Sequence, residues 1–321
     1  MTGSSVRRLG VVLLAFGLGA AVACGPDDGA STSTGRTTSS AEPPATTSTS
    51  STAAPRPTTT IAAPEPIPIA PPEGMELVWN DEFDGDGIDP TNWTYDIGGW
   101  GWGNGEAQYY TDRPKNARTE NGLLVIELHQ ERFEDSYYTS ARLKTQELRE
   151  FQYGWIEGRI KVPKGAGTWP AFWMLGTGFQ QDAPDPADQW PNVGEIDIME
   201  YVGREPDLVL GTVHGPGYAG AGGRTKWNRQ DFEIGDDFHT FAIDWDAEGI
   251  RWYFDDEMYS ELGPDDLGDR EWVFDQPFFI ILNLALGGTL GGNIDLDLEF
   301  PIQYYVDHVR VYQPISDEAD A

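Results

Sequence analysis

Three carboxylates lie close together in the segment QWPNVGEIDIMEYVG, residues 189–203: Glu195, Asp197 and Glu200. On a regular strand Glu195 and Asp197 share a face and Glu200 points to the other side, whereas on a helix the three share no face. A single β-bulge at Ile198-Met199 would add one residue and return Glu200 to the side of the other two acids. The spacing therefore predicts a bulged strand with all three acids on one surface.

The apolar residues between the acids support the same bulge. With one extra residue in the strand, Ile196, one of Ile198 or Met199, and Tyr201 point to the opposite side, into the core. The acids then lie on a surface backed by a hydrophobic interior.

Neighbouring carboxylates suit the cleavage of a glycosidic bond. Like charges raise the pKa of one acid and leave that of another low. One carboxylate can then attack the anomeric carbon while a protonated one gives its proton to the leaving oxygen. A solvated edge strand and a cation site are the two alternatives. A metal site is less favoured because no histidine joins the run and the acids stand a full strand repeat apart.

Tryptophans accompany the acids. Trp169, Trp173 and Trp190 precede them, and in GTWPAFWM the first two would share one side of a strand. Indole rings stack on the apolar faces of sugars, so both could line a groove, although a tryptophan is more often a core residue.

Strand patterns dominate the rest of the domain, and no long segment keeps the helical period. Alternating β-branched or aromatic runs bounded by turn residues indicate strands, here at residues 122–130, 153–163, 208–215, 239–259, 277–288 and 305–313. Short strands with regular turns predict an all-β sandwich of two antiparallel sheets.

The start of the chain is typical of an exported protein. Residues 1–24 have a basic start and a short apolar run, as in a signal peptide. Cys24, the one cysteine of the chain, follows directly and predicts lipidation, as in a bacterial lipobox. We expect a cell-surface lipoprotein or an extracellular protein.

Composition divides the remainder into three parts. Residues 25–73 are rich in Ser, Thr and Pro and predict a disordered tether. All twelve tryptophans fall in residues 74–315, the predicted catalytic domain, and residues 316–321 form an acidic tail. The net charge of −32 argues against nucleic acid or an anionic surface as a partner and is compatible with a neutral substrate. We expect a monomer.

The motif GEIDIME resembles the active-site signature of glycoside hydrolase family sixteen, in the form found in laminarinase-like endo-β-1,3-glucanases. The resemblance covers residues 75–313. Its other blocks stand in this sequence as LVWNDEFDG (77–85), WGNGEAQYYT (102–111), ENGLLVIE (120–127), YTSARLKT (138–145), YGWIEGRIKVPKGAGTWPAFWMLG (153–176), GTVHGPG (211–217), NLALGG (283–288) and VDHVRVYQ (306–313).

The resemblance implies a β-jelly-roll sandwich, whose concave sheet forms the substrate groove, and a retaining double displacement. Glu195 would be the nucleophile and Glu200 the acid and then the base. Asp197 would lie between them, hydrogen-bonded to Glu195. Retention requires a separation of about 5–5.5 Å between the two working carboxyl groups.

The resemblance also implies substrate-binding residues. These are Trp169, Trp173 and Trp190 beside the groove, Asn104 in WGNGE, His214 in GTVHGP and Arg142 in SARL. A core role is equally open for His214, and Arg142 could instead hold the sheet.

Many members of the family carry a structural calcium. The matching positions are Glu82, the backbone of Gly122, and Asp307, whose oxygens suit this ion. The alternative is that these acids are simply exposed. No cofactor is expected to be needed for catalysis.

The resemblance implies an endo-β-1,3-glucanase acting on laminarin-like β-glucan. A mixed-linkage β-1,3/1,4-glucanase and a non-catalytic β-glucan-binding lectin are the alternatives. The presence of all three acids favours an enzyme over a lectin.

Overall fold

The structure, a computed structural model, describes residues 61–62 and 64–315. The predicted signal peptide, Cys24, most of the predicted tether and the acidic tail lie outside these residues. The described end of the tether forms no helix or strand. It touches the domain, because Arg310 Nη2 donates a hydrogen bond of 2.8 Å to the carbonyl of Ile67.

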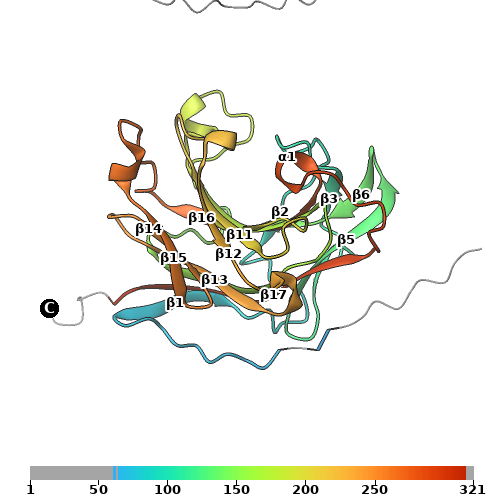
Figure 1. The fold of residues 1–321 in the computed structure, drawn as a ribbon. Helices are drawn as coiled ribbons and strands as arrows, with labels where there is room; N and C mark the ends of the chain where they lie inside the picture. The colour runs from blue at the N-terminus through green and yellow to red at the C-terminus, as the bar shows by residue number, and fades with distance from the viewer. Residues whose placement is uncertain (1–60, 63, 316–321) are drawn as a thin grey trace, which may run out of the picture. The chain divides into compact units, whose positions relative to one another are not determined.

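Two sheets make up the domain (Figure 1). The first has ten strands in the order β15-β14-β13-β8-β17-β5-β6-β3, with β1 beside β17 and β4 beside β5. Its strands are β1 (Met75–Asp81), β3 (Gln108–Tyr110), β4 (Ala117–Thr119), β5 (Leu124–Phe133), β6 (Ser136–Ser140), β8 (Gly154–Lys161), β13 (His239–Trp245), β14 (Ile250–Phe254), β15 (Glu257–Leu262) and β17 (Ile302–Pro314).

The second sheet has seven strands in the order β12-β11-β10-β9-β16-β7-β2. Its strands are β2 (Thr94–Tyr95), β7 (Arg142–Lys144), β9 (Thr168–Gly176), β10 (Glu195–Tyr201), β11 (Leu208–His214), β12 (Arg224–Arg229) and β16 (Phe278–Leu286). Neighbouring strands pair antiparallel throughout this sheet, whereas β3 and β6 of the first sheet pair parallel.

Alternating side chains explain why the two sheets pack face to face. In β8 every second residue is buried, so that Ile156 and Ile160 enter the core while Trp155, Glu157 and Arg159 are half-buried on the other side. β9 and β10 add core residues from the second sheet. The predicted two-sheet all-β sandwich is confirmed, and each predicted strand segment overlaps at least one strand.

Helices are short and lie in the connections. They are η1 (Pro186–Asp188), η2 (Gly220–Gly222), η3 (Ile234–Asp236), η4 (Pro264–Leu267) and α1 (Gly288–Gly291). None of the helices within the described residues has the length and hydrophobicity needed to cross a membrane.

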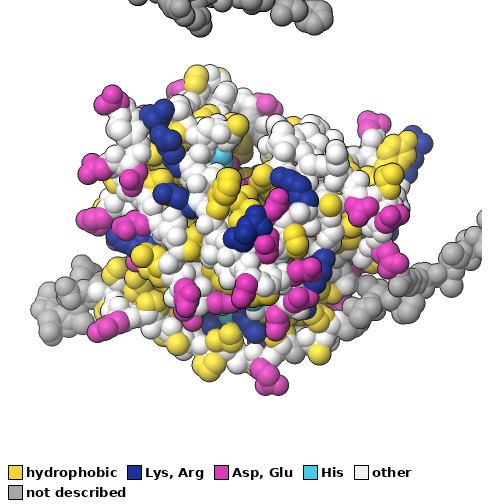
Figure 2. Space-filling model, viewed as in Figure 1, with side chains coloured by type: hydrophobic (Ala, Val, Ile, Leu, Met, Phe, Trp, Pro, Cys, Tyr) yellow, Lys and Arg dark blue, Asp and Glu magenta, His cyan; other side chains and the backbone are white. Residues whose placement is uncertain are grey.

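The surface carries its acids in a scattered arrangement. On the face shown in Figure 2, Asp and Glu side chains are spread over the whole surface with Lys and Arg between them. This distribution fits a solvated exterior better than a dedicated charged interface.

Candidate active site

The bulge that the sequence predicts is present in β10. Asp197 lies opposite Trp173 of β9 and Thr212 of β11, and the register then shifts before Glu200, which lies opposite Ala171 and Leu210. The extra residue falls at Ile198-Met199, as predicted. More side-chain surface is buried at this bulge than we expected. Both side chains are buried, at 1% and 0% exposure, whereas we expected only one in the core.

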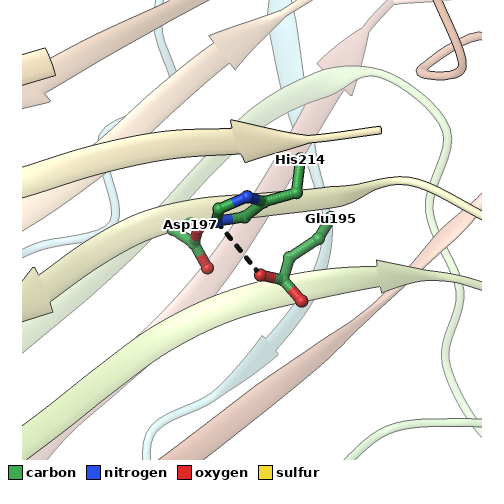
Figure 3. A group of neighbouring side chains, drawn as sticks. All are labelled: Glu195, Asp197 and His214. Carbon is green, nitrogen blue, oxygen red and sulfur yellow. Dashed lines mark ion pairs between the residues drawn. The ribbon is translucent and has the colours of Figure 1, made fainter. Parts of the chain in front are cut away.

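Glu195 and Asp197 face a histidine on the neighbouring strand. His214 lies opposite Glu195, and its Nε2 is 3.5 Å from Glu195 Oε1 and 3.4 Å from Asp197 Oδ2 (Figure 3). Asp197 Oδ2 is buried and has no hydrogen-bond partner among the described residues, and the hydrogen bond that we expected between Asp197 and Glu195 stays a prediction. His214 therefore links the two acids. Of the two roles that the sequence left open for this residue, the structure favours a role in the site over one in the core.

Glu200 has its own partners. Trp169 Nε1–H donates to Glu200 Oε1 over 3.1 Å, and Thr212 Oγ1 lies 3.5 Å from Glu200 Oε2. Trp169 comes from β9 and Thr212 from β11, so strands on both sides of β10 hold this carboxyl group in place.

Burial dominates the electrostatics of the three acids. It raises the pKa of Glu195, Asp197 and Glu200, each to about 8. The charge of Asp197 adds to the rise at Glu195 and Glu200, and that of His214 opposes it at both. Arg142 also opposes the rise at Glu195. Because the groups interact, they titrate as one unit, which retains protons close to neutral pH. Such a group can supply a proton to a leaving oxygen.

A buried tryptophan supports the bulge from the core side. Trp252 of β14 is fully buried, and its Nε1–H donates to the carbonyl of Asp197 over 2.9 Å. The bulge leaves this carbonyl outside the regular ladder, and the indole satisfies it.

The predicted binding residues surround the acids. Trp173 Nε1–H donates to Asn283 Oδ1 over 2.7 Å, and Arg142 Cζ lies 4.7 Å from the Trp173 ring centre and 4.8 Å from that of Trp102. Arg142 also forms an ion pair with Asp96 over 2.8 Å, and Asp96 directly follows β2, the strand beside β7. Arg142 therefore has both of the roles considered for it: it packs on Trp173, and it holds β7 to β2.

Two further predicted residues lie near the same place. The Trp190 ring is 42% exposed, and its centre is 5.9 Å from that of His214. Asn104 Nδ2 donates to Glu106 Oε1 over 3.2 Å, and its carbonyl accepts from the backbone N–H of Thr289.

A polar network beside Trp173 was missed by the sequence interpretation. Glu106 Oε2 accepts hydrogen bonds from Gln108 Nε2 at 2.6 Å and from the Tyr110 hydroxyl at 3.0 Å. The Tyr110 hydroxyl in turn accepts from Asn283 Nδ2 at 3.1 Å. The signal was available in EAQYY, where polar groups recur at every second position. We name this set, Glu106, Gln108, Tyr110 and Asn283, the Glu106 network.

The predicted calcium positions have other partners. Both Glu82 carboxylate oxygens accept from Arg310, at 2.8 Å each, and Asp307 Oδ2 pairs with Arg159 at 2.9 Å. The Glu82 side chain therefore does not fit a calcium ligand here, because an arginine already neutralises it. Calcium binding stays a prediction, and no step below depends on it.

The one cluster of acids and histidines in the described residues that could hold a metal is the site itself. Ligand atoms of Glu195, Asp197 and His214 lie within 4.8 Å of one another. Our sequence interpretation disfavoured a metal because no histidine joined the acids, and β11 brings one in. Without an ion, burial raises the pKa of Glu195 and Asp197, so the same cluster can act as an acid–base site.

Comparison with known proteins identifies the family of the chain. The sequence model of the glycosyl hydrolases family 16 matches residues 104–313. A beta-glucanase from Rhodothermus marinus is 47% identical over 251 residues, which span 74% of this chain and 85% of the relative. A glucan endo-1,3-beta-glucosidase from Cryptopygus antarcticus is 38% identical over 238 residues, spanning 69% of this chain and 84% of the relative.

Solved structures give the same result. The catalytic domain of an endo-1,3-beta-glucanase (laminarinase) from Thermotoga petrophila RKU-1 is 44% identical and superposes with a TM-score of 0.71, over 75% of this chain and 99% of that domain. The chain belongs to glycosyl hydrolases family 16.

Proposed function

We propose that the protein is an endo-acting β-1,3-glucanase that cleaves laminarin-like β-glucan with retention of anomeric configuration. The observation that carries this proposal is the set of three acids on one face of the bulged strand β10, with tryptophans from the adjacent strand beside them. Relatives that align along most of their length are named beta-glucanase and endo-1,3-beta-glucanase, which supports the linkage.

The reaction follows from the two outer acids. In the first step, Glu200 gives its proton to the glycosidic oxygen as the bond to the anomeric carbon breaks, and the Glu195 carboxylate bonds to that carbon. In the second step, Glu200 takes a proton from water, the water oxygen bonds to the anomeric carbon, and Glu195 leaves as a carboxylate. The second step thus returns the proton to Glu200 and the negative charge to Glu195, so both residues are ready for the next cycle.

Asp197 and His214 act as positioning residues in this proposal. His214 Nε2 lies within 3.5 Å of Glu195 and 3.4 Å of Asp197, so a proton on that nitrogen stabilises the charge that Glu195 needs as a nucleophile. Trp169 orients Glu200 through its N–H.

Reducing-sugar release from a linear β-1,3-glucan tests the proposal. The parent should be active, and Glu195→Gln and Glu200→Gln should each lower kcat by about 10²–10⁴-fold, because a nucleophile or a proton donor is lost. Unchanged anomeric configuration in the first product, read by NMR, tests retention. A parent that binds the glucan without cleaving it would be a lectin. A parent that cleaves only mixed-linkage glucan would keep the mechanism and refute the linkage.

We further propose that the enzyme is exported and held at the cell envelope through Cys24. Support comes from the sequence of residues 1–24, which has the layout of a signal peptide. Metabolic labelling with a fatty acid, compared between the parent and Cys24→Ala, tests it, and equal labelling would refute the anchor.

A further inference from the structure

Trp227 is more exposed than any other tryptophan of the chain. Its exposure is 72%, against 53% for Trp100 and 42% for Trp190. It lies on β12, the edge strand of the seven-stranded sheet. A single exposed hydrophobic residue is common on protein surfaces, so the significance of Trp227 depends on where its ring lies relative to the acids.

Strand pairing places Trp227 in line with the catalytic acid. Glu200 lies opposite Leu210 of β11, and Leu210 lies opposite Trp227 of β12. In the other direction, Glu200 lies opposite Ala171 of β9. Two strand spacings separate the Glu200 and Trp227 backbones, which is about 10 Å.

The Trp227 side chain points to the same face as the acids. Thr212 Oγ1 lies 3.5 Å from Glu200 Oε2 and 3.2 Å from Thr225 Oγ1, so Thr225 is on the side of the acids. Trp227 follows two positions later on the same strand and therefore shares that side. On β11 the alternate residues Val209 and Val213 lie in the core, which leaves Leu210 on the side of the acids as well.

The two residues extend the site with an apolar surface. Leu210, at 7% exposure, forms the floor between Glu200 and the exposed ring of Trp227. On β12 Arg229 is paired with Glu205 at 2.9 Å and with Asp207, so that this charge is neutralised.

We propose that Trp227 is a sugar-binding platform for a glucan chain that runs from the acids across β11 and onto β12. The proposal rests on the function proposed above, since the ligand is a more distant sugar of the same chain. The exposed ring of Trp227 lies on the face that carries the acids, and Arg229, the charged residue on that side of β12, is paired, as binding of the ring face of an uncharged sugar requires. A sugar bound there contributes to substrate binding, and it makes no contact with the bond that is cleaved.

Binding at a distance from the reacting bond predicts a specific kinetic effect. Contacts made equally in the ground state and the transition state change KM without changing kcat. Trp227→Ala should raise KM for a long linear β-1,3-glucan by about tenfold, the cost of one good aromatic contact, with kcat within about twofold of the parent. The rise in KM should disappear with a β-1,3-glucan oligosaccharide too short to reach β12.

The experiment compares three variants on long glucan and on a series of oligosaccharides of increasing length. Trp227→Phe keeps an aromatic face and should recover most of the lost affinity. Tyr253→Ala is the matched control, because Tyr253 of β14 packs on Trp155 on the side of the ten-stranded sheet opposite to Trp252. It should leave both kinetic constants unchanged.

The outcomes separate this proposal from the proposed function. If Trp227→Ala has the same KM as the parent on long glucan, the platform is refuted. It is also refuted if KM rises by the same factor on oligosaccharides of every length. If the parent hydrolyses nothing, affinity electrophoresis in gels containing linear β-1,3-glucan still tests whether Trp227 binds the glucan. Retardation of the parent that is lost in Trp227→Ala would retain the platform in a binding protein, and equal migration of the two would refute it.

Discussion

Burial of the three acids of β10 makes the folded protein less stable at pH values at which these groups would be ionised in the unfolded chain. Burial raises the pKa of Glu200 from 4.5 to about 8. Between these values the folded state binds more protons than the unfolded state, so the free energy of unfolding falls as pH rises. Below pH 4.5 both states are protonated and the penalty vanishes. Catalytic capacity is thus obtained at the expense of stability at neutral pH.

We expect Glu200→Gln to be more stable than the parent at pH 8 and close to it at pH 4. The difference should grow through this window with a slope of at most about 1.4 kcal/mol per pH unit, because Gln does not ionise. Urea unfolding of both proteins across the pH range measures it. A difference that is constant with pH would contradict the raised pKa.

Glu131 offers a control of opposite sign. Burial alone would raise its pKa, but hydrogen bonds from Lys115, Thr139 and Arg113 outweigh burial and lower the pKa to about 2. Its stabilising contribution is present above pH 4.5 and is lost as pH falls towards 2. Glu131→Gln should therefore destabilise the protein at pH 7, and its difference from the parent should shrink on acidification.

At the scale of elements, the bulge of β10 depends on a glycine opposite it. Gly211 of β11 lies between Thr212, which pairs with Asp197, and Leu210, which pairs with Glu200. A Cβ at this position would collide with the Trp252 ring and lie 2.7 Å from the Tyr259 hydroxyl. The absence of a side chain lets Trp252 reach the carbonyl of Asp197.

Gly211→Ala should destabilise the protein by about 1–3 kcal/mol, the usual cost of overpacking a core. It should also lower kcat, because displacement of Trp252 releases the Asp197 backbone. Gly222→Ala is the control, since a Cβ there meets nothing within 4 Å. Thermal unfolding and glucan hydrolysis measure both effects. If Gly211→Ala has the same thermal stability and kcat as the parent, the role of the Trp252 contact is refuted.

At the scale of the whole molecule, a buried arginine connects distant parts of the chain. Arg310 of β17 is 3% exposed and binds both oxygens of Glu82, which directly follows β1. It also holds the carbonyl of Ile67 and lies 3.8 Å from Glu157 of β8. The first and last strands of the domain are thereby joined on the sheet that does not carry the acids.

Arg310→Met should cost about 3 kcal/mol or more of stability, because it leaves Glu82 and Glu157 without their buried cation. Activity at low temperature should persist, since the catalytic residues are on the other sheet. Lys164→Met removes exposed pairs with Glu233 and Asp236 and should cost less than about 1 kcal/mol. Denaturant unfolding of the two variants measures the contrast, and equal losses would contradict the assigned role of burial.

Local patterns were sufficient for the two-sheet class and for the bulge. Alternation along a strand is a property of the chain itself, and the break between Asp197 and Glu200 has one simple repair. The tryptophans of GTWPAFWM were placed for the same reason, since Trp169 and Trp173 share one side of β9 and contact Glu200 and Asn283.

The partners across strands were decided by the tertiary structure alone. Pairing register brings His214 to Glu195 and Trp227 into line with Glu200, and the packing of one sheet on the other brings Trp252 to the carbonyl of Asp197. The Glu106 network and the Arg310–Glu82 pair likewise join segments far apart in the chain. The alternation in EAQYY places Glu106, Gln108 and Tyr110 on one side, but no local period encodes their contact with Asn283 or the other contacts, because these depend on which strands become neighbours when the hydrophobic faces of two sheets are buried together. The sequence by itself determined the acids and the face they share, and the packing of the sheets decided what surrounds them.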